Sequence, residues 1–254
     1  MGAETAAAHS KRKVLLTGGG GRIGKSIVEP LKQAFDLRLF DRQPVFGDPA
    51  TFIGTLQDRG ALEGAMAGCE AVIHLAATSD EAPFVEELVP NNVVGLYNAL
   101  EAALAAKVKR FIFASSCQAV CGHPVTASIT GEMAPAPVSL YGATKALGEA
   151  MGSWYHRKYG MEFVALRIGW FQNAADAAKN LTPQPPEGWG WRLCITPRDM
   201  IQLLRRSVEA EGVGFCIAGG TSKVRHEWLN LDSARKVLGY EPQDDLAALF
   251  GGSR

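Results

Sequence analysis

The sequence predicts an α/β fold in which a doubly wound parallel sheet of about seven strands is followed by a small C-terminal part. Short apolar runs of strand character alternate with longer helical patterns, as they do in β–α–β units. A run of glycines lies between the first strand and the first helix. The 254 residues, 47% of them hydrophobic, suffice for one well-buried domain.

The alternating pattern divides the chain into three parts. Residues 1–12 form a small, polar tail that we expect to be flexible, residues 13–169 carry most strands and helices, and residues 170–254 form a smaller region integrated with the core. Seven strands are expected, at Val14–Thr17, Leu37–Asp41, Thr51–Thr55, Ala71–Ala76, Arg110–Ser116, Glu162–Gly169 and Val213–Ala218. The fourth is apolar along its length, which is typical of a strand covered by helices on both faces.

Helical patterns fill the spaces between these strands. Five helices are expected: one from about Arg22, then Asn91–Lys107, Ser139–Tyr159, Pro197–Glu209, and one that ends near Leu238. Pro90 should break the helical region before Asn91, Ser139 can cap its helix, and Gly239 can end the last one. The segment Asn173–Arg192 contains several prolines and glycines, so we expect it to be mostly loop.

The composition argues against several classes of partner. Lysine plus arginine and aspartate plus glutamate each number 26, and without a basic run we expect no nucleic-acid partner. No apolar run approaches the roughly 20 residues of a membrane helix, so we expect no membrane partner. Five cysteines without a CxxC pair indicate free thiols, no metal site and a cytoplasmic protein.

The segment Thr17–Gly24 has the pattern of a dinucleotide-binding loop between a strand and a helix. Gly18 allows a tight turn and Gly21 lets the backbone approach a pyrophosphate, whose charge the helix N-terminus would meet. Gly24 lets the helix pack closely on the strand. The pattern predicts a Rossmann-like cofactor site, and the loop residues expected at the cofactor are Gly18, Gly21, Arg22, Ile23 and Gly24.

Asp41 ends the second expected strand, 23 positions after Gly18. An acid at this place accepts hydrogen bonds from the ribose hydroxyls of NAD. The same carboxylate would repel the 2′-phosphate of NADP, so we expect NAD as the cofactor. Arg42 is the competing consideration, because a following arginine can bind that phosphate.

Tyr141 and Lys145 lie four residues apart on one expected helix, so they share a face. A free tyrosine has a pKa of about 10 and is a poor base at neutral pH. We expect the neighbouring ammonium to lower that pKa. Ser116, which ends the fifth strand, can hold a substrate hydroxyl and stabilise a developing alkoxide. The three side chains are the candidate catalytic residues.

With these motifs in order, the chain resembles the extended short-chain dehydrogenases/reductases, the group of NAD-dependent sugar epimerases, dehydratases and dehydrogenases. The matching segments are Thr17–Gly24, Asp41, His74–Ala77, Asn92 with Gly95 and Asn98, Ala114–Ser116, Tyr141–Lys145, Arg167–Gly169 and Leu238–Pro242. The resemblance implies a Ser116–Tyr141–Lys145 triad. It also implies further cofactor contacts at Arg42, Leu56, Leu75, Ala76, Ala77, Asn92 and Ile168, beside Tyr141 and Lys145.

Within this group the chain is most similar to uronate dehydrogenases, which oxidise a sugar acid at its anomeric carbon. The chain departs from them at Cys117-Gln118, where they have Asn-His, and at Trp170, where they have serine. Their carboxylate-binding arginine has no clear counterpart here. The resemblance implies substrate contacts at Ser79, Ser116, Cys117, Gln118 and Trp170.

We expect Arg192 to bind the substrate anion. It lies between a Trp-Gly-Trp sequence and the short apolar stretch Leu193–Ile195, which can form a strand edge. An arginine can also hold a carboxylate or sulfonate through two parallel hydrogen bonds.

Three functions follow, in order of preference. The first is an NAD-dependent dehydrogenase that oxidises a small anionic sugar, of hexuronate or 6-sulfo-sugar type, at the anomeric carbon to its lactone. The second is a nucleotide-sugar epimerase, dehydratase or reductase, although only about 85 residues after Gly169 remain to build a nucleotide pocket. The third is an NAD-binding regulator. The resemblance also implies a homodimer through the Asn91 and Tyr141 helices.

Overall fold

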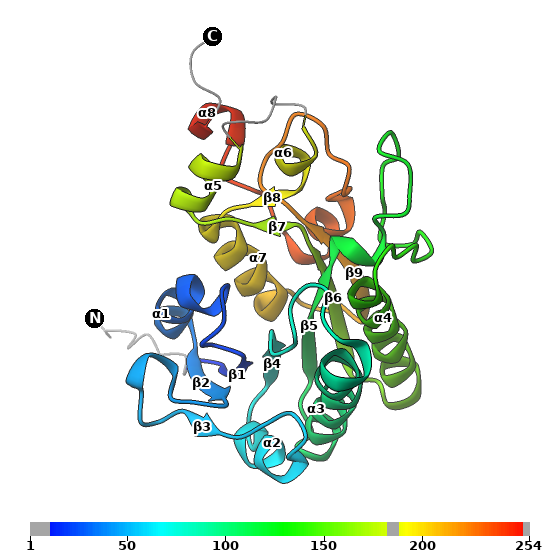
Figure 1. Cartoon of the computed structure of the whole chain (residues 1–254). Helices are drawn as coiled ribbons and strands as arrows, with labels where there is room; N and C mark the ends of the chain where they lie inside the picture. The colour runs from blue at the N-terminus through cyan, green and yellow to red at the C-terminus, as the bar shows by residue number, and fades with distance from the viewer. Residues whose placement is uncertain (1–10, 182–187, 251–254) are drawn as a thin grey trace, which may run out of the picture.

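The computed structural model describes residues 11–181 and 188–250 and is built on a parallel sheet of seven strands in the order β3-β2-β1-β4-β5-β6-β9 (Figure 1). The strands are β1 Lys13–Thr17, β2 Asp36–Asp41, β3 Phe52–Ile53, β4 Ala71–His74, β5 Arg110–Ser116, β6 Glu162–Ile168 and β9 Phe215–Gly220. The predicted fold class is confirmed. The strand order reverses between β1 and β4, which is the switch point where such sheets bind ligands.

Helices cover both faces of the sheet. They are α1 Gly24–Ala34, α2 Arg59–Met66, α3 Gly95–Ala105, α4 Leu140–Tyr159 and α7 Pro197–Glu209, with the shorter or wider turns η1 Val45–Gly47, η2 Phe84–Val94, η3 Cys117–Ala119 and η4 Ala234–Leu238. Ile27 of α1 and Leu203 of α7 belong to the apolar core on one face. Leu62, Leu100 and Tyr155, from α2, α3 and α4, belong to the core on the other.

Both ends of α4 are where the sequence predicts them. Ser139 Oγ accepts a hydrogen bond from Gly142 N at 2.9 Å and caps the helix. Gly160 follows the last turn with φ +74°, a conformation that favours glycine and ends the helix. Gly239 ends η4 in the same way, with φ +68°. These local signals therefore predict the helix boundaries correctly.

The fourth strand is shorter than expected, because its last residues turn toward the glycine loop. Leu75 N donates to Thr17 O at 3.2 Å, and Ala76 N donates to Thr17 Oγ1 at 3.3 Å. The third strand is also reduced, from Thr51–Thr55 to Phe52–Ile53.

The prediction that Pro90 breaks the helix before Asn91 is wrong. Pro90 lies inside η2, a π-helix that leads directly into α3. Its carbonyl accepts the N–H of Gly95, five residues on. The wider π-helical turn bonds i to i+5, so it accommodates a residue that interrupts normal α-helical bonding.

The prediction that Asn173–Arg192 is mostly loop is also wrong where the chain is described. Two helices form there, α5 Ala174–Leu181 and α6 Trp189–Leu193. Asn173 Oδ1 accepts from Asp176 N at 2.9 Å, a helix-start contact that the glycine and proline content concealed. The prolines of this segment lie outside the described residues.

The C-terminal part stands beyond the carboxyl end of β6, where Figure 1 shows α5, α6 and α8 grouped together. It adds the two-stranded parallel sheet β7 Trp170–Phe171 and β8 Cys194–Ile195, and helix α8 Leu246–Phe250. Strand β9 of this part pairs with β6 in the main sheet. Among the described residues, no helix is both long and apolar enough to span a membrane.

Candidate active site

The glycine loop forms a cradle that larger residues would fill. Gly18 has φ +77°, and a Cβ there would lie 2.6 Å from the main-chain nitrogen of Ala76. A Cβ at Gly24 would collide with the carbonyl oxygen of Gly19, so the helix packs closely on the loop. Gly21 is exposed, which leaves its backbone accessible to a ligand. The cradle therefore fits the pyrophosphate of a dinucleotide at the N-terminus of α1.

Asp41 lies beside this cradle. Its Oδ2 accepts from Gly20 N at 2.9 Å, and its Oδ1 accepts from Arg42 N at 2.7 Å. The carboxylate thus stands where a ribose hydroxyl would be bound. Arg42 itself is exposed, as is Arg22, which approaches Asp176 at 3.6 Å.

The other expected cofactor contacts come from several segments, on both faces of the sheet. Leu75, Ala76 and Ala77 are half-buried after β4, whereas Leu56, Ile168 and Asn92 are buried and Ile23 is half-buried. Asn92 is engaged with the protein: its Oδ1 accepts from Thr78 N at 2.8 Å, and its Nδ2 donates to Thr78 O at 2.9 Å and Thr144 Oγ1 at 3.2 Å. It therefore fixes the loop after β4 against α4.

The structure brings the three candidate catalytic side chains together. Ser116 ends β5, Tyr141 lies in the first turn of α4, and Lys145 follows one turn later. The side chain of Ser116 is near enough to that of Tyr141 to lower its pKa. Lys145 Nζ donates to Ala114 O at 2.8 Å and lies 5.5 Å from the centre of the Tyr141 ring.

The expectation that Tyr141 has a lowered pKa is wrong for the protein alone. The pKa of Tyr141 is raised to about 12, with burial as the largest cause; the interaction with Ser116 lowers this pKa, and Cys117 and Asp80 contribute to the rise. Burial also lowers the pKa of Lys145 to about 8. Desolvation of the phenolate is therefore the dominant effect on the pKa of Tyr141.

The expected substrate residues come from three segments of the chain and differ in exposure. Ser79 is exposed, Trp170 is half-buried in β7, and Cys117 is buried in a small apolar cluster. A hydrogen bond from Cys121 and burial raise the pKa of Cys117 well above its usual value. Gln118 contacts the protein with both ends of its amide, donating to Asp80 at 3.2 Å and accepting from Ser139 at 2.8 Å.

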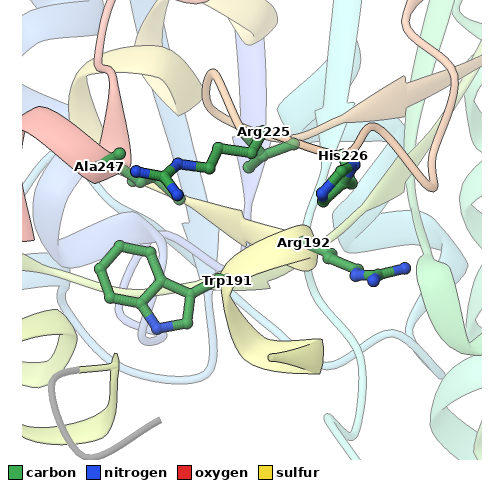
Figure 2. Close-up of a pocket in the computed structure, with 7 residues that line it drawn as sticks. Trp191, Arg192, Arg225, His226 and Ala247 are labelled. Atoms are coloured by element: carbon green, nitrogen blue, oxygen red, sulfur yellow. The ribbon is translucent and has the colours of Figure 1, made fainter. Parts of the chain in front are cut away.

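Arg192 lies in α6, in the C-terminal part of the chain. It lines a small hollow together with Trp191, Val224, Arg225, His226, Leu246 and Ala247 (Figure 2). The Arg192 and Arg225 side chains point in opposite directions there, and Arg192 Nη1 donates to Val125 O at 3.1 Å. None of the catalytic candidates lines this hollow. Trp191 is packed into the protein, with its indole N–H donating to Leu181 O at 3.0 Å.

Several supporting residues were not predicted from the sequence. Glu81 Oε2 accepts from Tyr141 N at 3.2 Å, and Asp80 takes a left-handed conformation with φ +66°. Glu149 and Arg167 form a buried ion pair of 2.8 Å beneath the site. Two of them had a usable signal: Glu149 lies eight residues after Tyr141, near the same helix face, and Arg167 belongs to the Arg167–Gly169 segment of the resemblance. The others come together from distant parts of the chain.

The family model and the sequence relatives agree on one protein family for this chain. The sequence model of the family described as "NAD dependent epimerase/dehydratase family" matches residues 14–171. The NAD-dependent glucose-6-phosphate dehydrogenase of Haloferax volcanii is 34% identical, covering 92% of this chain and 94% of its own. The uronate dehydrogenase of Pseudomonas putida is also 34% identical, covering 91% and 84%.

Solved structures agree with the sequence relatives. The glucuronic acid dehydrogenase of Chromohalobacter salexigens superimposes with a TM-score of 0.83 at 28% identity, over 94% of this chain and 86% of that one. The expected resemblance and the expected NAD cofactor are therefore confirmed. The chain belongs to the NAD-dependent epimerase/dehydratase family and is an NAD-dependent oxidoreductase of the extended short-chain dehydrogenase/reductase type.

Proposed function

We propose that this protein oxidises a small anionic sugar at its anomeric carbon to a lactone, with NAD as oxidant and Tyr141 as base. The observation that carries the proposal is the convergence of Ser116, Tyr141 and Lys145 at the carboxyl end of β5, next to the glycine cradle. Relatives named for glucose 6-phosphate and for uronates support an anionic sugar, since both substrates carry a negative group.

Each residue of the site has its own role in the proposed oxidation. Tyr141 accepts the proton of the anomeric hydroxyl, and Ser116 donates a hydrogen bond to the same oxygen as its negative charge grows. Lys145 lies against the Tyr141 ring and favours its phenolate form. Bound NAD supplies the hydride acceptor and a positive charge near Tyr141. Asp41 would hold the ribose of the cofactor, and the glycine cradle its pyrophosphate.

The substrate class can be tested by following NADH absorbance with aldoses, uronates, 6-phospho-sugars, 6-sulfo-sugars and nucleotide-sugars. Turnover of an anionic monosaccharide with stoichiometric NADH and a lactone product supports the proposal. Conversion of a nucleotide-sugar without net NADH would instead support the epimerase or dehydratase function, and cofactor binding without turnover of any sugar would support the regulator.

We further propose that Arg192 binds the anion of the sugar. Arg192 is the candidate because a guanidinium can hold a carboxylate or phosphate through two parallel hydrogen bonds. Arg192→Ala should weaken binding of the acidic sugar by about 2 kcal/mol and leave turnover of the matching neutral sugar almost unchanged. Arg205→Ala, on the exposed side of α7, is the matched control. Equal losses on both sugars would contradict an anion contact.

We also propose a cytoplasmic homodimer. All five cysteines are free, which suits a reducing compartment. Large apolar side chains are exposed on α3 and α4, among them Tyr97, Leu147, Trp154 and Tyr159. A second copy of this chain packed on the same face would cover them.

A further inference from the structure

Gln118 connects three segments of the active site. It lies in η3, two residues after Ser116, and its main-chain N–H donates to Ser116 Oγ at 3.2 Å. Its side-chain Nε2 donates to Asp80 Oδ1 at 3.2 Å, and its Oε1 accepts from Ser139 Oγ at 2.8 Å. One residue therefore links the end of β5, the loop after β4 and the start of α4.

The link to α4 involves the main chain as well as the side chain. The Ser139 hydroxyl that donates to Gln118 also accepts from Gly142 N at 2.9 Å, so the same oxygen caps the helix. Gly142 lies so close to the carbonyl oxygen of Gln118 that any side chain at this position would collide with it. The turn that carries Tyr141 thus rests directly on η3.

The link to the loop after β4 acts on a carboxylate near Tyr141. Asp80 has φ +66°, in the left-handed region that aspartate adopts more readily than most residues, and its side chain is held by Gln118. The following residue, Glu81, accepts a hydrogen bond from Tyr141 N at 3.2 Å. The charge of Asp80 also contributes to the raised pKa of Tyr141. Holding Asp80 therefore fixes part of the electrostatic surroundings of the base.

We propose that Gln118 is a positioning residue, which sets the separation of Ser116 and Tyr141 and orients Asp80 without contacting the sugar. This replaces the expectation, drawn from the resemblance, that Gln118 binds substrate. The roles of Ser116 and Tyr141 rest on the proposed function. A displacement of reacting groups by about 1 Å can cost about 100-fold in rate. The contacts of Gln118 with Ser116, Asp80 and Ser139, which we call the clamp, therefore matter to turnover.

Amide hydrogen exchange on the NAD-bound protein tests the clamp without requiring turnover. In Gln118→Ala, the amides of residues 78–81 and 139–143 should exchange about threefold faster or more, because both segments lose their hydrogen bond with the Gln118 side chain. In Gln118→Glu, the Ser139 contact persists while a carboxylate faces Asp80, so faster exchange is expected only in residues 78–81. Gln202→Ala is the matched control. Gln202 lies on α7, and its side-chain Oε1 accepts a hydrogen bond from Glu241 N at 2.8 Å.

Kinetics then separate positioning from substrate contact. Gln118→Ala should lower kcat by about 10–100-fold, while KM for the sugar stays within about threefold and the thermal midpoint stays near that of Gln202→Ala. A rise in KM with unchanged kcat would show a substrate contact and overturn the proposal, and unchanged exchange would overturn it too. If the wild type oxidises no sugar, the proposed function fails, while the exchange result still decides the clamp. If Gln118→Ala does not fold, the segment-specific exchange of Gln118→Glu decides it.

Discussion

At the scale of single residues, burial of Tyr141 disfavours its charged phenolate form. With a pKa of about 12 for Tyr141 and about 8 for Lys145, the protein at neutral pH holds a neutral phenol beside an ammonium. In the protein alone, Tyr141 is therefore a neutral phenol and not a permanently ionised phenolate. This differs from the simple expectation that a lysine four residues away lowers the tyrosine pKa, because the sequence does not show how completely the phenol is removed from water.

Tyr141→Phe tests the base directly, since it removes only the phenol oxygen. We expect kcat to fall by about 10²–10⁴-fold, while the dissociation constant for NAD stays near normal. Tyr159→Phe, at the exposed end of α4, should leave turnover unchanged. Steady-state NADH absorbance and cofactor titration measure both quantities. A Tyr141→Phe protein that keeps most of its activity would remove Tyr141 from the role of base.

His74 predicts a pH dependence of stability. It is buried in β4 and hydrogen-bonded to Thr17 Oγ1 at 2.9 Å, and burial, with a smaller effect of Lys145, lowers its pKa to about 3. Because the unfolded chain takes up a proton near pH 6.5 and the folded chain does not, stability is lost as pH falls from about 6.5 toward 3. The loss approaches about 1.4 kcal/mol per pH unit for this group.

Urea unfolding of the wild type and of His74→Gln, at pH 7 and pH 5, measures this contribution. The wild type should lose about 2 kcal/mol more than the variant between these values. Comparing the two proteins cancels the carboxylates that titrate in the same range. Equal losses would show that His74 is protonated in the folded protein.

At the scale of elements, a buried ion pair joins α4 to β6. Arg167 Nη2 donates to Glu149 Oε2 at 2.8 Å, Ser115 Oγ donates to Glu149 Oε1 at 2.7 Å, and both charged residues are nearly inaccessible. Arg167 Nη1 also donates to Thr130 O at 3.0 Å, which ties the segment after η3 to the sheet. The pair thus supports the helix that carries Tyr141.

Glu149→Gln should destabilise the protein by about 3–5 kcal/mol, because it leaves a buried arginine without its counter-charge. The exposed pair Arg205–Glu209, at 2.7 Å, provides the comparison. Glu209→Gln should change the free energy of unfolding by less than about 1 kcal/mol. Denaturant unfolding of both variants measures the difference. A small effect of Glu149→Gln would indicate that water or a local rearrangement compensates Arg167.

At the scale of the whole molecule, the apolar face of α3 and α4 predicts the assembly. Tyr97 and Trp154 are 48% and 47% exposed. Light scattering should give the wild type a mass near twice 27.2 kDa. The double variant Tyr97→Glu, Trp154→Glu should be monomeric, because charges there cannot be buried. Leu249→Glu, on the equally exposed helix α8, should remain a dimer. A monomeric wild type would contradict the proposed interface.

The sequence by itself determined the fold class, the family and the NAD cofactor. These depend on local signals: the strand–glycine–helix succession around Gly18, the acid Asp41 at the end of the next strand, and the helix-end residues Ser139 and Gly239. Each acts through backbone conformation or hydrogen bonds within a few residues. Such effects can be recognised in a short stretch of chain.

The features that depend on contacts between residues far apart in the sequence were decided only by the tertiary structure. The π-helix forms around Pro90 and helix α6 around Gly190, although proline and glycine disfavour helices locally. The raised pKa of Tyr141 follows from burial by the surrounding segments. The contacts of Gln118 join residues 38 and 21 positions away. No local pattern encodes such meetings, because they depend on how the whole chain is arranged around the sheet.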